Sequence, residues 1–142
     1  MHSPEKYKHI VQFHHTENPH DRNNLMLEYL EGETLGETLG ALETKYKSFI
    51  DDKIIENIKR KIQEIVNHIH SKSYAHGDIK QDNIMFRKKI VDPSIYDWVN
   101  NIVFIDFGEA KYIIPVFGIE VIDNLDKGML TELKNYLDEL KS

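Results

Sequence analysis

The sequence predicts an α+β fold in which short strands flank one long amphipathic helix. The helix is predicted by isoleucines between Ile54 and Ile69 that recur at intervals of four, four, three and four residues, the spacing of a single helix face. The strands are predicted by four short apolar runs bounded by polar residues, at positions 10–13, 25–30, 84–86 and 102–105. Since 40% of the 142 residues are hydrophobic, we expect a single domain over residues 1–142 with one core.

The first two apolar runs are predicted to pair as antiparallel strands, because only the polar residues 14–24 separate them. A short helix is expected next, over residues 32–42, where a Gly-Glu-Thr-Leu repeat places leucines on one face. Its interior glycines weaken it, since each costs about 1 kcal/mol relative to alanine.

The long helix is expected over residues 52–71, with Asp51 or Asp52 as its N-cap, because a carboxylate accepts hydrogen bonds from the first helical amides. Trp98 is expected to anchor the packing of the connection between the last two strands. A second amphipathic helix is predicted over residues 123–140. Its apolar stripe consists of Leu125, Met129, Leu133, Leu137 and Leu140.

The composition makes several classes of partner improbable. The 18 Lys and Arg against 24 Asp and Glu give a formal charge of −6, without a basic run that would bind phosphates or an anionic membrane surface. No stretch approaches the ~20 apolar residues that span a bilayer. Cysteine is absent, which suits a reducing compartment. We therefore expect an intracellular protein, cytoplasmic or nuclear, with no nucleic-acid and no membrane partner, and with scattered histidines rather than a histidine metal cluster.

Two polar motifs carry the chemical signal. The first is His76-Gly-Asp78-Ile-Lys80-Gln-Asp-Asn83, and the second is Asp106-Phe107-Gly108. The first resembles the catalytic loop of eukaryotic-type protein kinases, and the second resembles their metal-binding motif. The order of the elements is also similar to that family over residues 9–112, with a fourth strand, a fifth strand with hinge, and a helix before the loop. The resemblance implies a protein kinase-like α+β fold, mostly the helical large lobe with a small strand remnant of the N-terminal lobe.

The resemblance implies a role for each polar residue of the two motifs. Phosphoryl transfer depends on positioning and charge neutralisation, and the cofactors implied are ATP and Mg²⁺. Asp78 would orient and deprotonate the substrate hydroxyl, and Lys80 would neutralise charge on the transferred phosphate. Asn83 and Asp106 would supply hard oxygen ligands to magnesium. His76 would be a structural support.

The same resemblance implies an adenine site and a brace beneath the loop. Backbone groups of Glu28 and Leu30 would meet the adenine edge, with Leu27 at the gatekeeper position and Met85 under the ring. The helix at residues 123–140 would replace the central helix of the large lobe. In that position, Asp123 or Asp126 would cap amides of the catalytic loop.

The sequence also departs from the family pattern. Gly77 stands where most protein kinases have an arginine that couples activity to a phosphorylated activation loop, so we expect no such switch. His-Gly-Asp also occurs in small-molecule phosphotransferases, but Lys80 resembles kinases that act on serine or threonine. The run His-Gly-Asp-Ile-Lys looks like the vaccinia-related kinase group, which often has Asp-Tyr-Gly in place of Asp-Phe-Gly.

A glycine-rich loop and a phosphate-binding lysine strand are not found before the predicted hinge, and most of the C-terminal kinase helices are also missing, so we expect a truncated domain. Three functions remain open on this basis. The chain is a minimal serine/threonine protein kinase-like enzyme acting on a protein substrate, or a catalytically dead lobe mimic that binds a full kinase or its substrate. Alternatively, it is one half of a split kinase, completed by a separate small lobe. Another chain, or a second copy, that covers the open nucleotide site would contact Ile10, Leu25 and Leu27.

Overall fold

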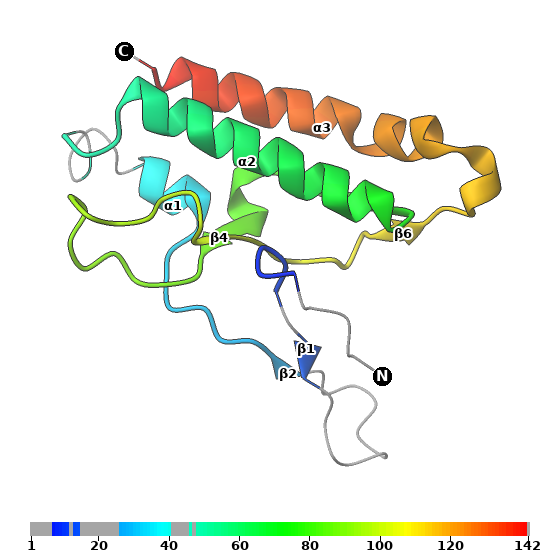
Figure 1. The fold of residues 1–142 in the computed structure, drawn as a ribbon, viewed down its shortest axis with the longest axis horizontal. Helices are drawn as coiled ribbons and strands as arrows, with labels where there is room; N and C mark the ends of the chain where they lie inside the picture. Colours follow the sequence, from blue (N-terminus) through cyan, green and yellow to red (C-terminus); the bar gives the residue numbers. More distant parts are fainter. Residues whose placement is uncertain (1–6, 12, 15–25, 41–45, 47, 142) are drawn as a thin grey trace.

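Two long antiparallel helices pack side by side above the short strands and loops (Figure 1). The computed structural model describes residues 7–11, 13–14, 26–40, 46 and 48–141. The α-helices are α1 (Leu35–Gly40), α2 (Asp52–Ser71) and α3 (Ile119–Glu139). The strands are β1 (Phe13–His14), β2 (Met26–Leu27), β3 (Tyr74–Ala75), β4 (Ile84–Phe86), β5 (Ile102–Phe104) and β6 (Lys111–Tyr112). Two 3-10 turns are η2 (Gln81–Asn83) and η3 (Pro115–Phe117).

Helix α2 has the predicted bounds, and its N-cap is Asp51. The Asp51 carboxylate accepts a hydrogen bond from the amide of Ile54 at 2.8 Å, which satisfies one of the orphan donors of the first turn. The predicted isoleucine face is confirmed except at its first position, where Ile55 is buried and Ile54 packs at the margin of the core. Each buried isoleucine contributes roughly 1.5–3 kcal/mol, so this face is a major source of stability.

Helix α3 begins at Ile119, four residues earlier than predicted. Pro115 starts the preceding turn and Gly118, with φ of 83°, leads into the helix. The predicted stripe is wrong at Leu125, which is 42% exposed. Since successive helical residues are rotated by about 100°, the face that meets α2 starts at Ile122 instead. The buried residues of this face are Ile122, Asp126, Leu130, Leu133 and Leu137.

The strands form three small antiparallel pairs. The predicted antiparallel pairing of the first two runs is confirmed as β1–β2, although β1 is only Phe13–His14. The predicted strands β4 and β5 also pair with each other, and Ile84 lies opposite Phe104. Residues 9–11 also run along β5, where the Val11 amide donates to the Phe104 carbonyl at 3.0 Å. The third pair, β3–β6, was not predicted from the sequence, because two-residue strands are too short to show an alternating pattern.

The shorter elements close the core. Helix α1 starts with a reciprocal capping box, in which the Thr34 hydroxyl accepts from the Glu37 amide and the Glu37 carboxylate accepts from the Thr34 amide. It begins at Leu35, three residues later than the predicted 32–42 segment, of which residues 41 and 42 lie outside the described chain. Trp98 is buried against three aromatic rings, as predicted for a packing anchor. Among the described helices, none is long and apolar enough to cross a bilayer.

Candidate active site

His76 holds the predicted catalytic loop against the end of β5. Its ring is fully buried, and Nε2 lies 3.0 Å from the carbonyl oxygen of Ile105, while the amide of Asp78 donates to Nδ1 at 3.1 Å. A neutral imidazole with its proton on Nε2 satisfies both bonds. The ring also meets Phe107 edge-on, with centroids 4.7 Å apart. This geometry agrees with a supporting role, because it ties the loop to the strand that leads into Asp106.

The loop brings three of the predicted site residues together. The Asn83 amide group donates to both the carbonyl and the carboxylate of Asp78, each at 2.9 Å. The Lys80 ammonium lies 3.8 Å from the other carboxylate oxygen of Asp78, and both side chains remain partly open to solvent. Asn83 itself is buried. The result is a partly exposed carboxylate that is oriented by Asn83 and lies next to the positive charge of Lys80.

Asp106 comes two residues after the end of β5 and has a left-handed backbone conformation, with φ of 55°. Such a conformation costs about 1–3 kcal/mol for a residue with a side chain and is concentrated at functional sites. Its carboxylate accepts from the amide of Gly108 at 3.2 Å. The preceding residue, Ile105, donates its amide to the Asn83 carbonyl at 2.9 Å, so the segments that carry Asp106 and Asn83 are joined by the backbone.

These two residues fit a magnesium ion that is shared with nucleotide phosphates. In proteins, magnesium is commonly held by one or two side-chain oxygens together with phosphate and water. Asn83 and Asp106 offer such oxygens from adjacent segments. Within the described residues, no group of three or more His, Cys, Asp or Glu could hold a metal by itself.

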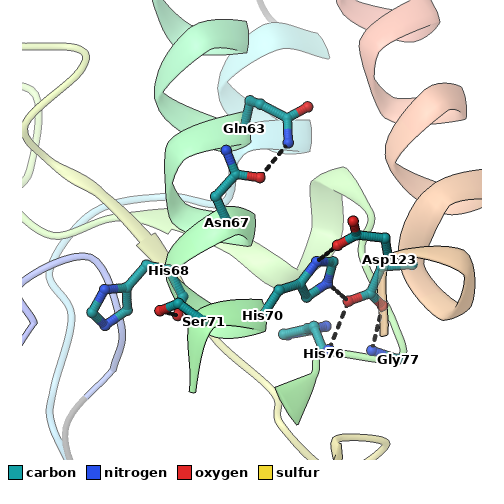
Figure 2. Close-up of polar contacts among 9 residues, drawn as sticks. Gln63, Asn67, His68, His70, Ser71, His76, Gly77 and Asp123 are labelled. Atoms are coloured by element: carbon teal, nitrogen blue, oxygen red, sulfur yellow. Dashed lines mark hydrogen bonds and ion pairs between the residues drawn. The ribbon is translucent and has the colours of Figure 1, made fainter. Parts of the chain in front are cut away.

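A charged cluster formed by α2 and α3 contacts the amides of the catalytic loop (Figure 2). The buried carboxylate of Asp126 accepts from the amides of His76 and Gly77, each at 2.9 Å, and lies 2.6 Å from Nε2 of His70. The other ring nitrogen of His70 lies 2.6 Å from the carboxylate of Asp123. Asp126 therefore caps the loop, as predicted for one of the two aspartates, whereas Asp123 contacts the histidine.

The cluster favours a charged imidazole between two carboxylates. Burial alone would lower the pKa of His70, but hydrogen bonds to Asp126 and Asp123 outweigh it and raise the pKa above its ordinary 6.5. Burial would raise the pKa of Asp126, but the bonds from His70 and the two loop amides lower it below 3.8. Sequence reasoning did not single out His70 as a site residue. Its only signal was a histidine in the last turn of an otherwise apolar helix face.

Gly77 fits where a side chain would not. Its φ is 86°, and a Cβ atom built on it would lie 2.2 Å from the carbonyl oxygen of Glu109. The loop thus touches the backbone just after the Asp106-Phe107-Gly108 motif. Glycine at this position is required by the backbone conformation and by this close approach.

Arg87 fixes the predicted hinge, a role that was not predicted from the sequence. Its guanidinium makes a two-pronged contact with the Glu28 carboxylate, at 2.9 and 3.1 Å, and also donates to the backbone carbonyl of Lys8. The Arg87 carbonyl in turn accepts from the amide of Glu31 at 3.0 Å. Because Arg87 directly follows β4, it connects the hinge to the strand that extends from the catalytic loop.

The predicted adenine-site residues lie around this connection. Thr34 forms an isolated bridge with Met85, so the segment after the hinge runs beside β4. Leu30 is partly buried. The backbone of Leu27 belongs to β2, but its side chain, like the whole of Leu25, lies outside the described part of the chain.

Comparison with known proteins agrees with this architecture. The family model "Protein kinase domain" matches residues 1–116. The chain is similar to the serine/threonine-protein kinase ppk34 of Schizosaccharomyces pombe, with 38% identity over 72 residues, which are 51% of this chain and 15% of that protein. It is also similar to the serine/threonine-protein kinase SSK22 of Saccharomyces cerevisiae, with 27% identity over 107 residues, which are 74% of this chain and 7% of that protein.

Solved structures show the same fold. A Rad53 kinase domain with SCD2 in complex with AMPPNP has a TM-score of 0.65 and 20% identity, over 94% of this chain and 48% of that one. A second structure of Rad53 kinase domain and SCD2 has a TM-score of 0.66 and 20% identity, over 94% and 47% of the two chains. The chain thus spans about half of these two kinase chains, and 15% and 7% of the two relatives named above. The likeness of the loop to the vaccinia-related group stays a prediction. With a protein kinase-like α+β fold and a matching family model, the chain belongs to the protein kinase domain family.

Proposed function

We propose that this chain is a serine/threonine-type protein kinase module that uses Mg-ATP to phosphorylate a hydroxyl group of a protein. The observation that carries the proposal is the fixed Asp78 carboxylate. The Asn83 side-chain amide donates to this carboxylate at 2.9 Å, and the Lys80 ammonium lies 3.8 Å from it. The backbone amide of Asp78 donates to the His76 ring, which supports the residue from the other side of the loop. A capped turn with no chemistry would not need a partly exposed carboxylate held in one direction.

The proposed reaction is an in-line displacement. The substrate hydroxyl oxygen forms a bond to the γ-phosphorus of ATP, the bond from that phosphorus to the bridging oxygen breaks, and ADP leaves with the electron pair. Asp78 accepts the hydroxyl proton, and Lys80 offsets negative charge on the transferred group. Asn83 and Asp106 would hold the magnesium ion, which supplies positive charge to the phosphates.

The proposal is tested first by titrating the purified chain with ATP, with and without magnesium, in a calorimeter. Binding should require magnesium and should be lost in Asp106→Ala, whereas Asp92→Ala, in the exposed connection between β4 and β5, should bind normally. Phosphate transfer from labelled ATP to a protein substrate should be abolished by Asp78→Asn. Transfer that persists in both Asp78→Asn and Asp106→Ala would refute the assignment.

A second candidate is a binding module that docks on a kinase or on a kinase substrate and transfers no phosphate. The chain spans 48% of one matched kinase chain, so the phosphate transfer of a whole kinase is not carried over to it by likeness alone. Recovery of a kinase in pull-downs that Asp78→Asn does not diminish, together with no ATP binding, would support this candidate. Activity that appears only with a co-expressed second chain would instead indicate a split kinase.

A further inference from the structure

We propose that His70 and Asp123 form a pH-operated latch between α2 and α3, in which loss of one proton from His70 moves the Asp123 carboxylate to Lys127. His70 lies in the last turn of α2, and its two ring nitrogens point to two carboxylates of α3 (Figure 2). Each N···O distance is 2.6 Å. The contact joins the two long helices at the end of α2 that leads into the catalytic loop.

The two contacts of His70 need two protons on one ring. An ionised carboxylate can only accept, so each contact requires a ring N–H. The charged imidazole carries an N–H on both nitrogens, whereas the neutral imidazole carries one. After a proton leaves to solvent, one ring nitrogen presents a lone pair to a carboxylate, and that contact becomes repulsive. The observed geometry is therefore that of the charged ring, and the neutral ring has to give up one side.

Burial decides which side opens. The Asp126 carboxylate is completely buried and also accepts from the amides of His76 and Gly77, so it cannot turn to water. A buried carboxylate that faced a lone pair would carry a heavy desolvation penalty. The Asp123 side chain is 53% exposed and can be hydrated instead. The proton therefore stays on Nε2, beside Asp126, and leaves from Nδ1, beside Asp123.

The released carboxylate has a second partner on its own helix. Lys127 follows Asp123 by four residues, and both line a cavity of about 510 Å³ between α2 and α3 together with His70. An acid four residues before a lysine is the favourable order for an ion pair on a helix. Lys127 is exposed, and its ammonium forms no ion pair within the part of the chain that the structure describes. Water from the same cavity can donate to the neutral Nδ1 of His70.

The other charged or titratable groups near His70 are Glu120 and Lys134 on α3, Lys72 at the end of α2 and His76 on the loop. Burial lowers the pKa of His70, but the carboxylates of Asp126 and Asp123 outweigh it and raise the pKa above 6.5. The contact with Asp123 is therefore complete below pH 6.5 and is lost as the pH rises through the folded value.

The latch also affects how the catalytic loop is held. While His70 is charged, the buried Asp126 that caps the loop has a full countercharge. After deprotonation, Asp126 keeps the hydrogen bond from Nε2 but loses this countercharge. The first turn of α3 loses its tie to the end of α2 at the same time, because Asp123 has moved away. One proton thus loosens both attachments of the helix that supports the loop.

The test follows the ring nitrogens of His70 by ¹⁵N NMR in the intact chain, from below pH 6.5 to about pH 9, where lysine is still charged. The His70 signals are identified by their absence in His70→Gln. Both nitrogens should carry a proton at the acidic end, and only Nε2 should carry one at the alkaline end, with a midpoint above pH 6.5. A ring that keeps both protons over the whole range, or that loses the Nε2 proton first, would overturn the proposal.

Substitutions separate the latch from a general effect of charge. Asp123→Asn should lower the midpoint by about 0.2–0.7 pH units, since the lost contact is half-exposed. Lys127→Met should raise the midpoint, because it removes the partner that holds Asp123 in the open state. This rise should vanish when Lys127→Met is combined with Asp123→Asn. The matched control is Lys53→Met, exposed at the other end of α2 and about 26 Å along the helix, which should leave the midpoint unchanged.

An unchanged midpoint in Lys127→Met would overturn the proposal. A rise of equal size in the Asp123→Asn background would also overturn it, since Lys127 would then act on His70 directly. Folding of each variant is checked by the fluorescence of the buried Trp98. These measurements need no nucleotide and no protein substrate, so the latch and the proposed function fail or hold independently.

Discussion

Replacing Asp126 with asparagine should lower the free energy of unfolding by about 3–5 kcal/mol. Asp126 is completely buried and accepts three hydrogen bonds, from the amides of His76 and Gly77 and from His70. In the side-chain orientation that keeps most hydrogen bonds, the asparagine oxygen still accepts from His70 and from the His76 amide. Its NH2 group then faces the Gly77 amide, so two hydrogen-bond donors point at each other. Each hydrogen bond to a charged group is worth about 1.5–3 kcal/mol.

The substitution also leaves the His70 charge with only one carboxylate. Removing one partner of a buried ion pair costs about 3–5 kcal/mol, in agreement with the loss of one such bond plus the new clash. This is a large share of the roughly 5–15 kcal/mol that stabilises a typical domain. The size of this loss in unfolding free energy follows from the complete burial of Asp126 and from its three hydrogen bonds.

Urea unfolding followed by Trp98 fluorescence measures this loss, since Trp98 is the single tryptophan and is buried in the core. Asp123→Asn is the matched control, because Asp123 lies on the same helix and contacts the same imidazole. Its side chain is 53% exposed, so its loss should cost less than about 1 kcal/mol. Equal losses in the two variants, or a loss below about 1 kcal/mol for Asp126→Asn, would refute the reasoning.

Three further predictions concern the same framework. The raised pKa of His70 stabilises the fold fully below pH 6.5, and this contribution disappears as the pH rises through the folded value. The stability difference between wild type and His70→Gln should therefore shrink in unfolding titrations above pH 6.5, and a constant difference would contradict the charged cluster. Gly77→Ala should destabilise by at least about 2 kcal/mol in urea, whereas Gly128→Ala, in α3 with open space around it, should stabilise by about 0.5–1 kcal/mol. If the proposed function is correct, Arg87→Met should weaken ATP binding by about tenfold, because the variant loses the contact that holds the hinge. Tenfold in affinity corresponds to about 1.4 kcal/mol. Arg60→Met, on the exposed side of α2, should bind ATP like the wild type. Equal affinities of the two arginine variants in calorimetry would show that the hinge contact is not needed.

Local patterns determined much of this protein from the sequence alone. The bounds of α2 and its Asp51 cap were predictable, because helix periodicity and capping act over three or four residues. The grouping of Asp78, Lys80 and Asn83 was predictable for a similar reason, since these residues share one short loop. Their proposed roles came from a motif, and the fold class followed from the order of the elements.

Contacts between distant segments were decided only by the tertiary structure. The bond from His70 to Asp126 joins residues 56 positions apart, and the pair Arg87 and Glu28 spans 59 positions. The sequence named Asp123 and Asp126 as equal candidates for the cap, and only the packing of α3 against α2 placed Asp126 beneath the loop. The earlier start of α3 and the exposure of Leu125 depend on the same packing. The physical reason is that local propensity selects a helix, whereas the face that it buries depends on which other elements it meets.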